Sequence, residues 1–397
     1  MKETNFKQTE VGMIPCDWNV KKLGDLGEPC MCKRILKQQT SSVGDIPFYK
    51  IGTFGGEPDA YISRSVFEEF KAKYNYPKKG SLLLSAAGTI GRVVVFDGKD
   101  SYFQDSNIVW IDNDEKLVLN DFLYYCYSQM KWTTENGGTV SRLYNENLKS
   151  ASFAAPKSIE EQKRIAQALS DVDTVISTTE KLIAKKKALK QGTMQTLLSG
   201  KMRIQNGKWI KTTNFKQTEL GPIPQEWDIT PLGNIYRFKY GIFNNNPDNG
   251  GPYPIYGANG IIGGYTSYNA EDSVVIGHIG TAGTVIWAEG KHFVTYNGTI
   301  ADIREKNVND SRYGYFQLLN LDIPSICNGS SQPFLAYDKL NILKIPLPPT
   351  KEEQTAIATV LSDMDSEIAA LETKLAKYRQ LKTGMMQQLL TGKVRLV

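Results

Sequence analysis

Residues 4–10 of this chain read TNFKQTE, and residues 213–219 read TNFKQTE again without a change. The likeness continues beyond the second Glu at the same offset of 209 residues. The further matched pairs are Gly12 and Gly221, Ile14 and Ile223, Pro15 and Pro224, Trp18 and Trp227, Leu23 and Leu232, and Gly24 and Gly233. One folded unit has therefore been duplicated within the chain.

A second matching block lies later in each copy. Glu160-Glu161-Gln162 recurs as residues 352–354, and the match continues to Arg203 and Arg395 at a constant offset of 192 residues. The second copy is therefore 17 residues shorter (209 minus 192), and the loss falls between the two blocks. A period near 200 residues is too long for a solenoid and indicates domain duplication.

The later block predicts a long helix in each copy. Apolar residues recur in steps of four and three, which is the heptad pattern of helices that pair. In the second copy they are Ile357, Leu361, Met364, Ile368, Leu371, Leu375 and Tyr378; in the first they are Ile165, Leu169, Val172, Ile176 and Ile183, with Thr179 and Lys186 as weaker positions. Ser158 with Glu161, and Thr350 with Glu353, fit capping boxes that begin the helices. Each helix would be roughly 60 Å long at 1.5 Å per residue.

Two arrangements of these helices are compatible with the pattern. Each could be an amphipathic helix on a separate core, or the two could pair as an antiparallel coiled coil. Equal length and matching register favour the pair. Such a pair would hold the two globular units apart about a pseudo-two-fold axis.

The globular blocks are strand-rich with short helices, as in Ser81-Leu82-Leu83-Leu84 and Ser273-Val274-Val275-Ile276, which are bounded by Gly, Asn and Asp turns. The fold class is therefore α+β. The expected organisation is a globular domain at 1–157, a long helix at 158–200, a linker at 201–212, a globular domain at 213–349 and a long helix at 350–392.

The two globular blocks share some turns and differ in others. Gly-Thr-x-Gly occurs in both, with Thr89 and Thr281, and shared features suit shared tasks such as phosphate contact. Two loop pairs diverge, and they are rich in Arg, Lys, Asn and Gln, the side chains that read base edges in DNA. The candidate DNA-binding residues are Lys33, Arg34, Lys37, Gln38, Thr89, Ser141, Arg142, Asn145, Asn244, Asn245, Asn246, Thr281, Ser331 and Gln332. The alternative is that they are ordinary solvated turns, which Asn and Gly favour.

Composition bounds the function. A net charge of +5 permits a polyanionic partner without requiring one. The five cysteines are irregularly spaced, and the two histidines lack a nearby carboxylate cluster, so neither a disulfide framework nor a metal site is expected. No apolar run is long enough to span a membrane, the N-terminus resembles no signal peptide, and we expect a cytoplasmic protein. Phosphate-binding loops and nucleophile elbows are absent from the sequence, so no catalytic residues are assigned.

Taken together, these features resemble the specificity (S) subunit of type I restriction-modification systems. The resemblance rests on the twofold order of elements: an opening such as Gly12 to Trp18, a helix that begins at Pro156 to Gln162 or Pro348 to Gln354, and an end at Leu197 to Lys201 or Leu389 to Lys393. It implies that each globular unit is a target recognition domain reading one half of a split, asymmetric DNA site.

The resemblance further implies that the helices set the unread gap. Two methyltransferase (M) subunits would dock on them, with restriction/translocase (R) subunits joining the complex. S-adenosylmethionine, ATP and Mg would be bound by those partners, and this chain would hold no cofactor. Two rival hypotheses remain: a DNA methyltransferase or nuclease with unrecognised motifs, and a coiled-coil scaffold that presents two binding domains.

Overall fold

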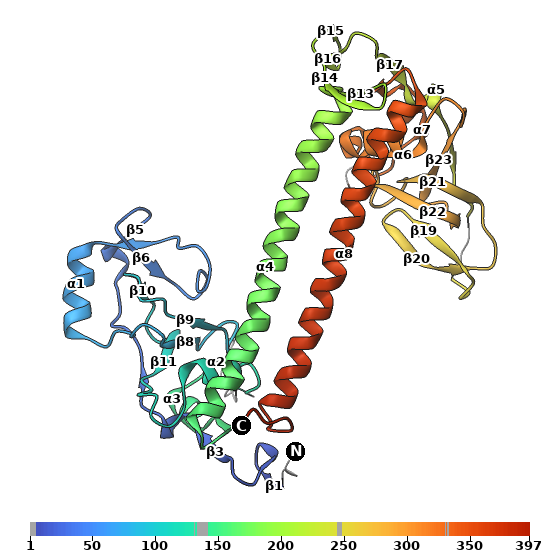
Figure 1. Ribbon diagram of the computed structural model, residues 1–397. Coiled ribbons are helices and arrows are strands. Elements are labelled where there is room, and N and C mark those ends of the chain that lie inside the picture. The colour runs from blue at the N-terminus through green and yellow to red at the C-terminus, as the bar shows by residue number, and fades with distance from the viewer. Residues whose placement is uncertain (1–4, 131, 133–141, 244–247, 330, 332) are drawn as a thin grey trace. The chain divides into compact units, whose positions relative to one another are not determined.

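The computed structural model describes residues 5–130, 132, 142–243, 248–329, 331 and 333–397 (Figure 1). The chain forms two compact units: Met1–Thr178 with Leu375–Val397, and Thr179–Lys374. Each unit contains one globular part and segments of both long helices, α4 and α8. The mixture of strands and helices in each unit confirms the α+β class.

The globular part of the first unit is built from short strands. One four-stranded sheet has the order β10-β6-β7-β5, and another has the order β4-β11-β8-β9. In the first of these sheets the strands are, in that order, Tyr102–Phe103, Ile46–Tyr49, Tyr61–Ile62 and Thr40–Ser41. In the second sheet they are Pro29–Cys30, Ile108–Ile111, Leu82–Ser85 and Val93–Val95. The pairs β1 (Phe6–Thr9) with β2 (Gly12–Pro15), and β3 (Asn19–Lys22) with β12 (Ser152–Ala155), complete it, together with α1 (Arg64–Lys73), α2 (Asn120–Tyr127) and α3 (Asn145–Ser150).

The second unit has one larger sheet of six strands in the order β18-β23-β21-β22-β19-β20. These strands are Tyr236–Tyr240, Gly298–Ile303, Ala270–Gly277, Val285–Val294, Tyr253–Gly257 and Gly260–Tyr265. The two-stranded pairs are β13 (Met202–Gln205) with β14 (Lys208–Lys211), β15 (Phe215–Thr218) with β16 (Gly221–Pro224), and β17 (Asp228–Pro231) with β24 (Lys344–Leu347). The short helices are α5 (Leu232–Ile235), α6 (Ser311–Asn320) and α7 (Tyr337–Ile342).

The two globular parts share one strand frame. The order β4-β11-β8-β9 in the first matches β18-β23-β21-β22 in the second. In the second globular part, the long strand β22 pairs with β21 and also pairs in parallel with β19. In the first globular part, a separate strand, β10, makes the equivalent parallel pair with β6. The shared frame means that loops at equivalent strand ends can be compared residue by residue.

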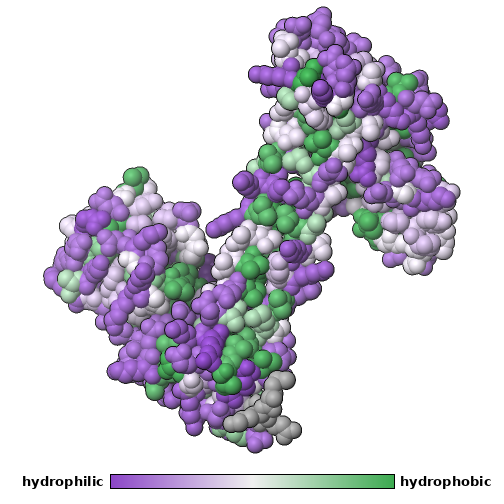
Figure 2. Space-filling view, in the orientation of Figure 1, coloured by the Kyte–Doolittle hydropathy of each residue, from purple (hydrophilic) through white to green (hydrophobic). Residues whose placement is uncertain are grey.

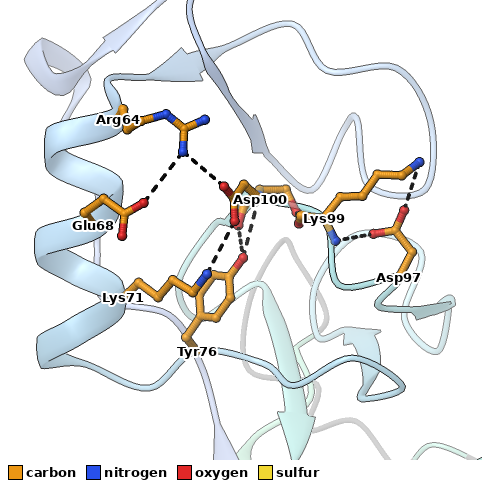
Figure 3. A network of polar contacts seen from close by, with 8 residues as sticks. Arg64, Glu68, Lys71, Tyr76, Asp97, Lys99 and Asp100 are labelled. Atoms are coloured by element: carbon orange, nitrogen blue, oxygen red, sulfur yellow. Dashed lines mark hydrogen bonds and ion pairs between the residues drawn. The ribbon is translucent and has the colours of Figure 1, made fainter.

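Helix α1 accounts for much of the length difference between the copies. It lies between β7 and β8, whereas β20 is followed almost directly by β21. Figure 3 shows how α1 is attached: Asp100, in the β9–β10 loop, bonds Arg64 at 3.1 Å and Lys71 at 3.4 Å. The Arg64 guanidinium, followed by Lys71, holds the pKa of Asp100 below its ordinary value. The Tyr76 hydroxyl adds a bond to the Ser101 carbonyl at 2.9 Å, so polar contacts fix the inserted helix to the frame.

The long helices are α4 (Ile159–Leu198) and α8 (Lys351–Leu389). Both pass from one unit into the other. The predicted heptad residues form their buried face, with Leu169 and Leu361 fully buried and Ile183 and Ile368 each 7% exposed. Even the weaker position Thr179 is only 9% exposed.

Ion pairs show how the helices pair within each unit. In the second unit Lys186 bonds Glu367 at 2.7 Å and Lys190 bonds Asp365 at 2.5 Å. The α8 partner number falls as the α4 number rises, so these segments are antiparallel. In the first unit Asp173 of α4 bonds Lys382 of α8 at 2.6 Å. The expected antiparallel pair is therefore confirmed, and the alternative of two unrelated amphipathic helices is excluded.

A partly buried arginine cluster joins the segment after α8 to the first globular part. Arg395 donates to the Glu161 carboxylate at 2.5 and 2.8 Å and to Asp17 at 2.9 and 2.8 Å. Glu161 is 3% exposed, and Arg395 holds the pKa of Asp17 below its ordinary value. The Ser158 hydroxyl accepts from the Glu161 N–H, as a capping box requires, while the Glu161 carboxylate is bonded to Arg395.

The second unit repeats this cluster with the end of α4. Arg203 donates to Glu353 at 3.0 and 3.1 Å and also bonds Glu226. The Trp227 Nε1 donates to the same Glu353 at 3.3 Å. We name these two sites the arginine knots: Arg395 with Asp17 and Glu161, and Arg203 with Glu226 and Glu353.

A glycine lies beside each knot where no other residue fits. Gly392 has a φ of +68°, and a Cβ there would come within 2.4 Å of Pro15. Gly200 has a φ of +71° and meets Pro224 at the same distance. Both conditions exclude a side chain, because L-residues rarely adopt this conformation and the space is filled.

Surface and interior follow the usual partition. Trp18 and Leu389 share one hydrophobic cluster in the first unit, and Trp227 and Leu197 share another in the second. Hydrophilic residues dominate the visible surface of both globular parts (Figure 2). Within the described residues, no helix combines the length and apolar character needed to cross a membrane.

Candidate nucleic-acid interface

Three loops of the first globular part meet at one hollow. They are the segment after β4, the turn between β10 and β11, and the segment before α3, and the end of β6 lies beside them. The hollow is lined by Arg34, Ile35, Phe48, Lys50, Gln104, Asp105, Ser106, Asn107 and Arg142. Arg34 and Arg142 are far apart in sequence, and the fold brings both predicted residues to this one place.

Polar neighbours orient both arginines. The Arg34 Nε bonds the Asp105 carboxylate at 2.8 Å, and the Arg34 side chain remains 66% exposed. The Arg142 Nη2 donates to the Asn107 Oδ1 at 3.1 Å. A guanidinium carries five N–H donors in a fixed fork, so these contacts fix its direction while other donors face outward. This is the arrangement with which arginine reads the O6 and N7 of guanine.

Thr89 lies at a neighbouring hollow. It is exposed on a turn between Gly88 and Gly91, and Ser85 and Arg92 also line that hollow. The Ser85 hydroxyl closes the turn by donating to the Thr89 carbonyl at 2.5 Å. A small hydroxyl on a fixed, exposed turn suits contact with a phosphate group.

The remaining predicted residues of the first domain lie apart. Lys33 is exposed above the Tyr74 ring, 5.2 Å from its centroid. Lys37 and Gln38 are exposed in the short helix Lys37–Gln39, and Asn145 is the exposed first residue of α3. Ser141 lies outside the described residues.

The described residues of the second globular part place loops at the equivalent strand ends. Thr281 is exposed on the equivalent glycine turn, and Ser331 is exposed in the segment before α7. Asn244, Asn245, Asn246 and Gln332 lie outside the described residues. At this site Tyr240 stacks on His278 with ring centroids 4.0 Å apart, and Tyr296 and Tyr337 flank Tyr240 at 5.8 and 4.9 Å.

Some residues at the interface were not predicted from the sequence. Lys50, Gln104 and Asn107 line the first hollow, and Gln104 accepts from the Ile51 N–H at 2.9 Å. They belong to a short turn and a strand end rather than to a long polar loop. The sequence did contain one indication of Asn107: the second copy has Asn297 at the equivalent position. The match appears only when the two copies are aligned with an offset of 190 residues.

The histidines have structural surroundings. The His278 Nδ1 is 2.7 Å from the Leu335 carbonyl, and His292 lies between Ser273 and the Gly290 carbonyl at 3.0 and 2.8 Å. Burial lowers the pKa of His292, so the neutral ring is favoured. Among the described residues, no group of three or more His, Cys, Asp or Glu could hold a metal ion.

Comparison with known proteins identifies the family. The model for the type I restriction modification DNA specificity domain matches residues 15–189 and again residues 224–378. These two matches cover most of the chain, and the chain belongs to this family. The resemblance seen in the sequence is thereby confirmed, and recognition of DNA sequence is the role that the family assigns.

Individual relatives agree. A protein of Haemophilus influenzae, provisionally named a type I restriction enzyme specificity subunit, is 61% identical over 159 residues, covering 40% of this chain and 41% of the relative. The type I restriction enzyme MjaVIII specificity subunit of Methanocaldococcus jannaschii is 25% identical over 438 residues, covering 100% of this chain and 97% of the relative. The crystal structure of a type I restriction-modification S subunit from M. genitalium shares the fold, with a TM-score of 0.66 and 18% identity over 94% of this chain and 96% of that chain.

Proposed function

We propose that this chain is the non-catalytic specificity subunit of a type I restriction-modification complex. Its globular domains, 1–157 and 213–349, each read one half of a bipartite, asymmetric DNA site. One observation carries this proposal: the same exposed loop arrangement is built twice on a shared strand frame, but with different side chains. Identical domains would read a symmetric site, whereas unlike domains read two different half-sites.

In the first domain the reading groups are Arg34 and Arg142, with Thr89 contacting the phosphate backbone. Asp105 and Asn107 orient the two guanidinium groups. A bidentate arginine selects guanine over the other bases, because only guanine presents two acceptors side by side in the major groove. We expect guanine in the half-site of the first domain.

The long helices, 158–200 and 350–392, are proposed to set the gap between the half-sites, and residues 201–212 connect the two copies. The support is that α4 and α8 are unbroken and carry a buried seam with ion pairs in both units. A paired helix resists bending better than a flexible linker, so it suits a fixed spacing.

The chemistry belongs to partners in this proposal. Two methyltransferase subunits would dock on the helices, and restriction/translocase subunits would join them on double-stranded DNA. S-adenosylmethionine, ATP and Mg would be held by these partners. Family membership supports this division of labour.

The test is to express the chain with its methyltransferase partners and map methylated adenines across a host genome. We expect one split motif with two unlike halves. Replacing residues 213–349 with the equivalent domain of another family member should change one half only. Methylation without a split motif, or robust methyl transfer by the purified chain alone, would refute the proposal.

A further inference from the structure

The reading positions of the two domains can be matched through backbone contacts. In the first domain Ala87 forms an isolated antiparallel bridge with Arg142. In the second domain, Ile279 forms the same bridge with Phe334. Ile279 lies 192 residues after Ala87, and Phe334 lies 192 residues after Arg142. Phe334 therefore takes the place of Arg142.

A second match concerns the turn before the central strand of each sheet. The Ala86 N–H donates to the Asn107 carbonyl at 2.8 Å, and the His278 N–H donates to the Asn297 carbonyl at 2.7 Å. Just before this contact, the Gln104 N–H donates to the Tyr49 carbonyl at 2.9 Å and the Thr295 N–H donates to the Tyr256 carbonyl at 3.0 Å. Counting forward from this earlier contact, Tyr296 stands where the first domain has Asp105, and Ser106 is one additional residue in the first domain.

The third match uses the opening offset of 209 residues. This offset holds along β4 and β18. Cys30 of β4 pairs with Trp110, and Lys239 of β18 pairs with Ile300, which is the residue equivalent to Trp110. The same offset carries Lys33 onto Ile242 and Arg34 onto Phe243. Four charged positions of the first domain are therefore apolar or aromatic in the second. The pairs are Lys33 and Ile242, Arg34 and Phe243, Asp105 and Tyr296, and Arg142 and Phe334.

These four side chains of the second domain face solvent. Phe243 is 71% exposed, Ile242 53%, Phe334 42% and Tyr296 40%. Scattered exposed apolar residues are ordinary, but several on adjoining loops mark a binding surface. The backbones of two of them adjoin, since the Tyr296 N–H donates to the Ile242 carbonyl at 3.1 Å.

A cluster of aromatic rings adjoins these positions. Tyr240 stacks on His278, which in turn bonds the Leu335 carbonyl, the residue next to Phe334. Tyr337 also contacts the Tyr240 ring, with centroids 4.9 Å apart. Aromatic rings packed in this way support neighbouring apolar side chains by van der Waals contact, without ion pairs.

We propose that the second domain reads its half-site through apolar contact with thymine methyl groups, made by Ile242, Phe243 and Phe334. Thymine alone among the bases presents a methyl group in the major groove, and Phe is among the side chains that contact it. The first domain selects hydrogen-bond acceptors, and the second selects a hydrophobic edge. This inference rests on the proposed function, because it specifies what the second reader recognises.

The direct probe is deoxyuridine, which lacks the methyl group of thymidine and is otherwise identical. The full complex is titrated with duplexes in which single thymidines are replaced by deoxyuridine. The half-site of the second domain is the half that changes when residues 213–349 are exchanged. We expect about a fourfold loss of affinity at one or more thymidines of that half, the value of one buried methyl group.

The variants Phe334→Ala and Phe243→Ala connect this loss to the proposed residues. Each should bind thymidine DNA more weakly and should no longer distinguish it from deoxyuridine DNA at one position. Ile342→Ala is the matched control, because Ile342 is 73% exposed at the far end of α7. It should leave both affinities unchanged.

Three outcomes would overturn the inference: a second half-site without thymine, deoxyuridine binding as well as thymidine throughout it, or Phe variants that weaken both DNAs equally. The last would indicate a wedge between base steps instead of methyl recognition. If domain exchange alters neither half of the motif, the proposed function itself fails. The two failures are therefore distinguishable.

Discussion

The arginine knots are alike in the two halves of the chain, whereas the proposed reading surfaces differ between them. Arg395 with Glu161 and Arg203 with Glu353 repeat one geometry in both units. At the reading surface, Arg142 of the first domain corresponds to Phe334 of the second. Contacts that hold a helix to a domain have been kept, while contacts available to DNA have changed their chemistry. A specificity subunit can acquire new half-sites in this way without altering its framework.

The largest expected effect comes from lengthening the framework. We would insert seven residues into each long helix, between Ile176 and Thr179 of α4 and beside Leu375 of α8. An insertion of one heptad in both helices should keep their apolar seams in register with each other. Seven residues add about 10 Å, which corresponds to about three base pairs of unread DNA. Motif mapping by adenine methylation measures the result. An unchanged gap would show that the helices do not set the spacing, and insertion into α4 alone is the control that should abolish recognition.

Breaking a knot should have the next largest effect. Arg395→Ala leaves Glu161 buried without its charge partner, which costs about 3–5 kcal/mol of unfolding free energy. Arg203→Ala should cost a similar amount through Glu353, since both carboxylate side chains are 3% exposed. Urea denaturation of the full chain measures both. A loss below about 1 kcal/mol in either variant would contradict the view that the knots are equivalent supports.

Changing the reading surface should affect recognition and leave stability intact. Arg34→Ala and Arg142→Ala should each relax one base position of the first half-site by about 1–3 kcal/mol. Lys78→Ala is the control, because Lys78 is also exposed and paired with an aspartate, Asp112, at the end of β11 opposite Asn107. Competition binding with base-substituted duplexes measures the discrimination. Retained selectivity in both variants would remove these arginines from the interface.

The smallest effect tests where the knots differ. Trp227 Nε1 donates to Glu353 at 3.3 Å, while Trp18 Nε1 is buried without a partner among the described residues. Substitution of either tryptophan by Phe removes the indole N–H. The loss of side-chain volume is the same at both positions. Trp227→Phe should therefore destabilise the chain by about 1 kcal/mol more than Trp18→Phe. Equal losses would indicate that the Trp227 bond contributes nothing.

The sequence was most informative where the copies agree. Matching heptads predicted the paired helices. Four seam residues, Ile357, Leu361, Ile368 and Leu375, are buried as expected, and Met364 and Leu371 are half-buried. The repeat also revealed Arg203 and Arg395 as matched residues, but not their partners. Glu161 and Arg395 are 234 residues apart, and contacts across such separations leave no periodic pattern. For the same reason, the sequence did not show that residues 375–397 complete the first unit.

At the reading surface the sequence predicted which loops matter better than which residues meet. Arg34 and Arg142 were both predicted, and the structure places them at one hollow. Asn107 was missed because it lies in a turn of ordinary composition. The replacement of Arg142 by Phe334 was not visible in the sequence either, because the offset between the copies changes repeatedly and only backbone contacts show which positions correspond.

The make-up of the first unit has a consequence for synthesis on the ribosome. The second unit is continuous and is complete once residue 374 has emerged, whereas the first must wait for residues 375–397. At ordinary elongation rates the delay after residue 178 is roughly 10–40 s. The domain that is made first is therefore finished last. We therefore expect a chain that ends before Arg395 to be cleaved by proteases in its N-terminal domain sooner than in the second unit, whose residues are all present.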